Sequence, residues 1–217
     1  GQTLIINCCL EAAPLARLCV RSAYEAGARD VLVNWSDNDV SRSRMELGSE
    51  EALTDFKSYQ LRRYLDYAES EGGVCVLHLL ADDPEVYAGL DGAKISRVNA
   101  AQRKFMAPWR EYTMNDRVQW SIAAMPSAPW AKKIFPELDE AAAIEKLWQL
   151  IFDVCRVTDG DPVNEWKAHL DRLTGLKDKM NALDLESVHF ESSNGTDLTV
   201  GLSLIHISEP TRLDVIS

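Results

Sequence analysis

The alternation of short apolar runs with longer helical segments most strongly limits how this chain can fold. Apolar and β-branched residues form strand-like runs at residues 3–9, 31–35, 74–80 and 118–124. A stretch with helical spacing of apolar residues follows each run. Because parallel strands need long crossover connections, this order predicts an α/β fold, with a mostly parallel sheet and helices on both faces.

The stretch from Val118 to Phe135 shows the alternation most clearly. Its first part is an apolar run whose intervening residues are mostly small or apolar, which is typical of a strand covered on both faces. Pro126 and Pro129 end this run, and Ser127 lies where a side-chain oxygen caps a helix. We therefore expect a covered strand, a turn and a capped helix, at the kind of strand end where α/β sheets bind ligands.

Glycine, proline and polar residues mark the expected ends of the helices. Gly27 suits the C-cap of the first helix, and Pro162 suits the first position of the last one. The predicted helices span residues 11–26, 58–71, a short segment from 82, 92–110, 139–155 and 162–183.

The architecture changes after residue 183. Two strand-like runs, Val188–Glu191 and Thr196–Leu202, flank Asn194-Gly195, which is a strong hairpin signal. We expect residues 1–183 to form an N-terminal α/β domain. Residues 184–202 are expected to form the first hairpin of a second, truncated β-containing domain.

Composition and charge argue against several classes of partner. The net charge of −11 opposes binding to nucleic-acid phosphates, which relies on a basic surface. No apolar run approaches the roughly 20 residues that span a membrane, and the first residues lack the features of a signal peptide. The five cysteines show no CxxC spacing, so neither a disulfide framework nor a zinc knuckle is indicated. We expect a cytoplasmic protein that binds neither nucleic acid nor a membrane.

Acidic residues after two predicted strands are the first candidates for chemistry. Asp37 and Asp39 follow one strand, and Asp82, Asp83 and Glu85 follow another. A parallel sheet can gather such carboxylates around a metal ion. Capping of helix N-termini is the commoner role of these residue types, and it needs no metal.

The histidines and serines provide weaker signals. No two of His78, His169, His189 and His206 have ligand spacing such as HExxH. Ser121 and Ser127 have no base that the sequence reveals, and the GxGxxG, GxxxxGK[ST] and GxSxG motifs are absent. The residues alone therefore assign no catalytic, cofactor-binding or metal-ligating side chain.

Four segments resemble one known family in order and approximate spacing. They read SAYEAGARDV from residue 22, WSIAAMPSAPWAKKIFPEL from 120, DPVNEWKAHL from 161 and GTDLTVGL from 195. On these motifs, residues 1–202 resemble the N-terminal portion of the thermophilic aminopeptidase family of metallopeptidases, which includes aminopeptidases T, S and II.

The resemblance implies a two-domain metallopeptidase, a hydrolase that removes single residues from peptide N-termini. It also implies a homodimer and two divalent metal ions, which are zinc, cobalt or magnesium. The family's ligands are two glutamates, two histidines and an aspartate in the domain after the hairpin. None of those motifs occurs here, so no catalytic, cofactor-binding or metal residue is carried over, not even His189 or Asp197. We expect this fragment to be inactive and metal-free, with its α/β domain shaping the cleft and the dimer.

The last residues depart from the family pattern. The family continues after Leu202 with an aromatic-containing segment, whereas residues 203–217 read SLIHISEPTRLDVIS, which resembles translated sequencing-adapter read-through. We expect this tail to be non-native and the natural start of the protein to be missing. A non-catalytic α/β binding or regulatory module is the alternative function, and a dinucleotide-type enzyme is disfavoured by the missing glycine motif.

Overall fold

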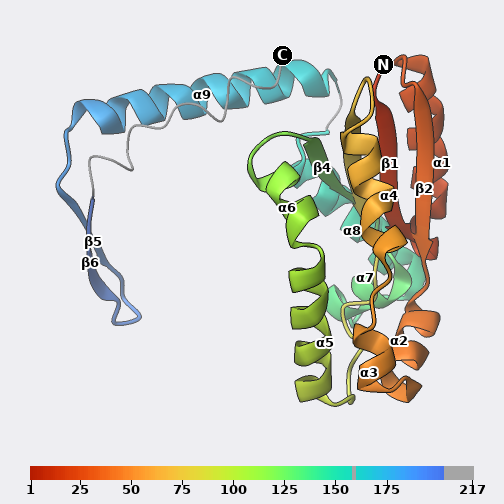
Figure 1. The fold of residues 1–217 in the computed structure, drawn as a ribbon. Helices are drawn as coiled ribbons and strands as arrows, with labels where there is room; N and C mark the ends of the chain where they lie inside the picture. Colours follow the sequence, from red (N-terminus) through yellow and green to blue (C-terminus); the bar gives the residue numbers. More distant parts are fainter. Residues whose placement is uncertain (158–159, 203–217) are drawn as a thin grey trace. The chain divides into compact units, whose positions relative to one another are not determined.

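The predicted parallel sheet is present in the computed structural model, which describes residues 1–157 and 160–202 (Figure 1). Its strands are β1 (Thr3–Cys9), β2 (Asp30–Ser36), β3 (Val74–Leu80) and β4 (Gln119–Ala124), each within one residue of the expected range. The strand order is β2-β1-β3-β4, and all three pairs are parallel. The α/β fold class is therefore confirmed.

Helices cover both faces of the sheet. A 3-10 turn, η1 (Leu10–Ala12), leads into α1 (Ala13–Glu25), which packs on one face, while α4 (Ser58–Ala68) and α6 (Ala107–Met114) pack on the other. Consecutive side chains of β1 point to opposite faces of the sheet, because side chains alternate along a strand. Ile6 packs with the α1 side and Ile5 with the α4 side, and both are at most 2% exposed.

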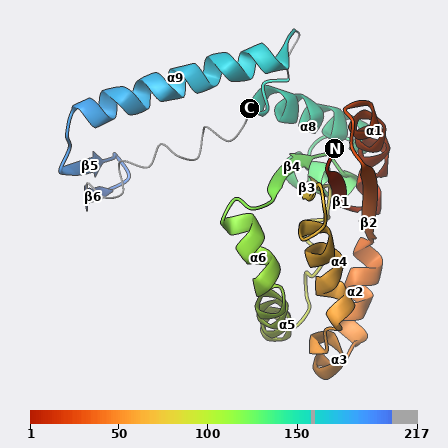
Figure 2. The ribbon, with the colours of Figure 1, turned by 45° about the horizontal axis from the view of Figure 1, so that its top comes forward.

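Two smaller groups of helices complete the first unit. Helices α2 (Asn38–Leu47), α3 (Glu50–Thr54) and α5 (Gly92–Phe105) pack together through Met45, Leu53 and Val98. Figures 1 and 2 place these three helices side by side beyond the carboxyl ends of the strands. Helices α7 (Ala128–Ile134) and α8 (Glu140–Val154) pack through Ala131, Ala143 and Leu147.

The chain divides into two compact units, residues 1–151 and 152–217. The second unit holds α9 (Pro162–Ala182), β5 (Ser187–Glu191) and β6 (Asp197–Gly201). The two strands pair antiparallel, and Gly195 in their turn has a φ of +90°, so the expected hairpin is confirmed.

The unit boundary and the expected domain boundary are defined by different properties of the chain. Contacts within the chain group α9 with the hairpin, so the first unit ends at residue 151 and not at 183. Independent folding is a separate property, so the domain ranges 1–183 and 184–202 stay predictions. The expected non-native tail, residues 203–217, lies outside the described residues. Among the described residues, no helix combines the length and apolarity that crossing a membrane requires.

Two expected helices are wrong in detail. The segment expected over 92–110 is two helices, α5 and α6, divided at Met106. Pro108 lies in the first turn of α6, where its missing N–H cannot continue the helix before it. The short helix expected from residue 82 is a series of turns over residues 84–89, in which backbone hydrogen bonds join residues three apart.

Strand β4 is not covered on both faces as expected. Trp120 and Ile122 are 50% and 53% exposed, and β4 pairs only with β3 among the described strands. The apolar pattern indicates which side chains share a face of the strand, but it does not determine whether another element covers that face.

Candidate functional site

A cavity of about 590 Å³ opens beside the carboxyl ends of β1 and β2. Leu10 follows β1, Trp35 and Ser36 end β2, and Asp37 follows β2 at the cavity wall. Helices α2 to α5, with residues next to them, supply the remaining described wall. Ligands of open α/β sheets bind outside the carboxyl ends of the strands, so this cavity lies where the fold favours a site.

Aromatic rings form much of the wall and are held in place. Phe56 and Phe105 stack with their ring centroids 5.0 Å apart. The ring centroids of Tyr64 and Trp109 are 5.1 Å apart, and the Tyr64 hydroxyl donates to Asn7 Oδ1 at 3.0 Å. Packing and hydrogen bonding therefore fix the position of the Tyr64 ring before any ligand arrives.

Basic side chains near the cavity hold its walls together. Arg42 of α2 donates to the carbonyl oxygens of Val86 and Ala88, at 2.8 and 3.1 Å. Lys94 of α5 donates to the carbonyl oxygen of Gly48 at 2.7 Å. These bonds tie the turns after β3 and helix α5 to helix α2 and its C-terminal end.

Arg97 of α5 forms a third such tie, to Glu50 of α3. Its Nε and Nη2 each donate to a carboxylate oxygen at 2.8 Å, and this bonding lowers the pKa of Glu50. The paired arrangement fixes direction as well as distance, because the guanidinium fork matches the two carboxylate oxygens. Helices α3 and α5, which form part of the cavity wall, are therefore joined by a geometrically specific contact.

Arg44 and Arg63 line the same cavity but have no such partner. Within the described residues, neither guanidinium takes part in an ion pair or a hydrogen bond. Arg63 lies 5.6 Å from the centroid of the Tyr64 ring, a distance at which cation–π attraction acts. Asp37 is the single carboxylate on the described wall, and its Oδ1 accepts from the backbone N–H of Val40 at 2.8 Å. The cavity wall therefore combines aromatic rings with uncharged polar side chains, among them Gln60 and Asn99, and an excess of positive charge.

Three of the five acidic candidates have local structural roles. Asp37 caps α2, and Asp83 Oδ1 accepts from the backbone N–H of Glu85 at 2.8 Å. Glu85 pairs with Lys133, and Asp39 and Asp82 are exposed. In residues 1–157 and 160–202, no three His, Cys, Asp or Glu side chains come together to hold a metal ion.

The histidines have separate environments. His78 is half-buried in β3, and burial lowers the pKa of its imidazole. His169 lies beside two arginines, and burial followed by those two cations lowers the pKa of its imidazole. His189 Nε2 lies 2.7 Å from Asp197 Oδ1 on the exposed hairpin. His206 lies outside the described residues.

Ser127 does not cap α7 through its side chain as expected. It occupies the N-cap position and is 4% exposed, but its hydroxyl has no hydrogen-bond partner among the described residues. Pro129 at the second helical position has no N–H to donate, which removes one of the two usual partners of a capping oxygen. Ser121 is exposed on β4.

The cavity residues Arg44 and Arg63 are absent from the sequence-based candidates. The lining residues come from separate segments between Leu10 and Met106, and no fixed spacing relates them. The one available signal is the position of Trp35 to Asp37 at a predicted strand end. That signal indicates the edge of the sheet but not the helices that complete the wall.

The comparisons with known proteins point to one family. A family profile described as Thermophilic metalloprotease (M29) matches residues 1–209. The chain is 31% identical over 207 residues to aminopeptidase AmpS of Bacillus subtilis, covering 95% of this chain and 50% of that protein. It is 33% identical to aminopeptidase 2 of Geobacillus stearothermophilus, covering 95% and 49%.

A solved structure agrees with these sequence matches. The structure titled wild-type AmpT from Thermus thermophilus superposes with a TM-score of 0.82 at 29% identity, covering 93% of this chain and 49% of that one. The chain thus spans about half the length of the relatives that it matches. The family match covers well over half of the residues, so the chain belongs to the M29 family of thermophilic metalloproteases.

Proposed function

We propose that this chain is the N-terminal part of a metal-dependent aminopeptidase that removes single residues from peptide N-termini. The observation that carries the proposal is the family match over residues 1–209. Relatives named as aminopeptidases, at 31% and 33% identity, support the same activity. The proposed protein is cytoplasmic, acts as a homodimer on peptides and uses two divalent ions, which are zinc, cobalt or magnesium.

The described part of the chain does not fit such ions. Among the described residues, no group of three His, Cys, Asp or Glu side chains is placed to hold one. Asp37 and Asp83 accept hydrogen bonds from backbone N–H groups, and Glu85 pairs with Lys133. We therefore place the metal ligands outside residues 1–202 and expect this chain alone to be inactive. Its proposed role is to shape the substrate cleft and the dimer.

A non-catalytic binding module is the second candidate function, and the cavity favours it. The described residues that line the cavity include two arginines and several aromatic rings but no histidine or cysteine. Such a wall offers contacts for a ligand without the paired base and nucleophile that covalent catalysis requires.

An assay of two proteins tests the proposal. The purified chain and a full-length relative are each given a leucine-type chromogenic amide, with cobalt, zinc or magnesium and then with a chelator. We expect chelator-sensitive turnover by the relative, because metal ions activate the attacking water, and none by this chain. Turnover by this chain would refute the placement of the metal ligands. No turnover by the relative would refute the aminopeptidase proposal.

A further inference from the structure

We propose that the cavity beside the carboxyl ends of β1 and β2 binds a small organic anion with a flat apolar body. The chemical class is an aromatic or similarly flat carboxylate or phosphate. The proposal rests on the cavity alone and does not depend on peptidase activity.

The volume of the cavity and its wall residues indicate the size and shape of the uncharged part of the ligand. A volume of about 590 Å³ suits a small molecule, since ligand cavities usually hold about 300–1,000 Å³. Phe56, Phe105 and Tyr64 present aromatic rings on the wall, and Trp35 is 46% exposed at the end of β2. Aromatic rings stack favourably on other aromatic rings in offset or edge-to-face arrangements, so the wall favours an aromatic body.

The unpaired arginines set the charge of the ligand. Arg42, Lys94 and Arg97 are also basic and lie near the cavity, yet each is bonded to a neighbouring helix or turn. Arg44 and Arg63 have no ion pair or side-chain hydrogen bond within the described residues, and the cation–π contact of Arg63 with Tyr64 leaves its N–H donors unused. A guanidinium presents a fork of donors that matches a carboxylate or a phosphate.

Charge balance around the cavity strengthens this assignment. The described wall carries two cations, Arg44 and Arg63, and one carboxylate, although the whole chain carries a net charge of −11. One oxygen of that carboxylate, in Asp37, already accepts a backbone hydrogen bond. An anionic ligand would balance the local excess of positive charge, whereas a cationic one would increase it.

The walls are organised before binding, which lowers the entropic cost of binding. The hydroxyl of Tyr64 donates to Asn7, and Asn34 Nδ2 donates to the same oxygen of Asn7 at 2.8 Å. Arg97 joins α5 to α3 through two hydrogen bonds to Glu50. A ligand therefore has to order mainly the two arginines.

Titration of the 217-residue chain with matched probes tests the proposal. The probes are N-acetyl-L-phenylalaninate, its neutral amide and phenyl phosphate, followed by isothermal calorimetry and by tryptophan fluorescence. We expect an anion to bind at least about tenfold more tightly than the amide, because each charge-assisted hydrogen bond adds stabilisation. Comparison of the two anions identifies the preferred head group, and Trp35→Phe should remove the fluorescence change.

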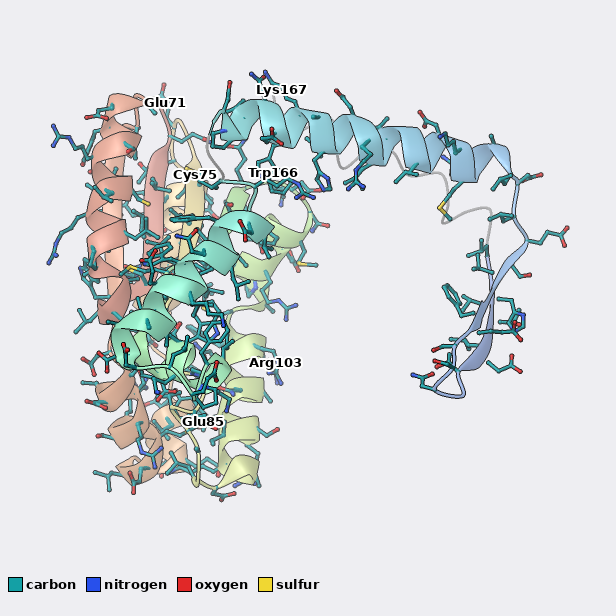
Figure 3. The ribbon with its side chains drawn as sticks, turned by 180° about the vertical axis from the view of Figure 1, so that it is seen from behind. Glu71, Cys75, Glu85, Arg103, Trp166 and Lys167 are labelled. Carbon is teal, nitrogen blue, oxygen red and sulfur yellow. The ribbon has the colours of Figure 1, made fainter. Side chains whose placement is uncertain are left out.

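Variants locate the binding site. Arg44→Gln together with Arg63→Gln should weaken anion binding at least about tenfold and leave binding of the amide unchanged. Arg103→Gln is the matched control, because Arg103 is exposed on α5, points away from the neighbouring helices and does not line the cavity (Figure 3). Its affinity for the anion should stay within about twofold of the unmodified chain. Circular dichroism checks that each variant keeps its helices.

Three outcomes would overturn the proposal: no binding of either anion, equal binding of anion and amide, or unchanged anion affinity in the double variant. The comparison of anion with amide uses the unmodified chain, so it holds even if the double variant does not fold. Added salt provides a further check, since it should weaken binding of the anion but not of the amide.

Discussion

Strands β1 and β6 both carry apolar side chains, yet these side chains differ in burial. Ile5 and Ile6 of β1 are buried between helices on the two faces of the sheet. Leu198 and Val200 of β6 are 53% and 40% exposed, and no residue of α9 is buried. The same contrast separates α1, which buries Ala16, from α9.

The difference shows that an apolar pattern specifies an element but not its burial. Burying an apolar side chain contributes roughly 1.5–3 kcal/mol, and this contribution requires a second surface. Residues 1–151 supply that surface from several helices, whereas α9, β5 and β6 bury no side chain. We therefore expect the two regions to respond differently to the same chemical changes.

Thiol labelling should give the largest contrast. Burial is the main cause that raises the pKa of the Cys9 thiol, to about 11, and Cys155 is exposed. Relative to an ordinary thiol of pKa 9.0, Cys9 has roughly a hundredfold less thiolate at neutral pH, and its burial further slows access. Mass spectrometry after timed alkylation should show Cys155 labelled first and Cys9 only after unfolding in urea. Similar labelling rates for the two thiols would contradict the buried environment of Cys9.

Truncation of matched aliphatic residues should give the next largest contrast. Ile6→Ala should lower the free energy of unfolding by about 2–5 kcal/mol, because it leaves a cavity in a packed core. Leu198→Ala should change the same quantity by less than about 0.5 kcal/mol, since the side chain is already half-exposed. Urea denaturation followed by circular dichroism measures both values. A large loss for Leu198→Ala would show that the hairpin is covered in solution.

Removal of a helix cap should have a smaller effect, confined to the second region. Asp161 Oδ1 accepts from the backbone N–H groups of Val163 and Asn164 at the start of α9. Asp161→Ala should cost about 0.5–2 kcal/mol of local helix stability, whereas Asp161→Asn should keep the capping oxygen and most of that stability. Amide hydrogen exchange measures the change. Equal protection of the first turn in both variants would contradict the capping role.

The smallest difference between the two regions should appear in how salt changes the pKa values of their histidines. Burial alone lowers the pKa of His78, whereas burial and two nearby arginines lower that of His169. Added salt should therefore raise the pKa of His169 and leave that of His78 unchanged, because salt screens charges but does not alter burial. Nuclear magnetic resonance titrations in low and high salt measure both values. Equal salt shifts would contradict the assigned causes.

The lowered pKa of His78 also predicts how the stability of the folded chain changes with pH. The pKa of His78 is below its ordinary value of 6.5, so the folded state binds a proton less readily than the unfolded state. Neutral His78 makes its full contribution to the free energy of unfolding above about pH 6.5. This contribution is lost as the pH falls towards the lower pKa that His78 has in the folded state. His78→Gln should remove this part of the pH dependence, which thermal unfolding at pH 7.5 and 5.5 measures.

Local signals predicted most of the fold. The four parallel strands follow from apolar runs, and the hairpin follows from Asn194-Gly195. The start of α9 follows from Pro162, which lies directly after the capping residue Asp161. The errors arise where several local preferences compete. Pro108 divides a helix whose apolar spacing continues past it, and Ser127 takes the N-cap position without using its side-chain oxygen.

The candidate site was much less predictable than the fold. Asp37 is a candidate because it follows a strand, and it does reach the cavity, but as the cap of α2. Arg44, Arg63 and Phe105 meet only because α2, α4 and α5 assemble beyond the sheet. Their functional meaning depends on which basic side chains already have partners. That property belongs to the folded chain and has no signature in the order of residues.

The central position of β1 has a consequence for synthesis on the ribosome. β1 is made before the other three strands of its sheet, yet it lies between β2 and β3, and Thr3 pairs with Val74. The nascent chain must therefore keep Ile5 and Ile6 unpaired on one side until β3 has been made. Contacts between residues so far apart form slowly, because the intervening chain must first be ordered. Any factor that shields β1 during translation should increase the yield of folded protein.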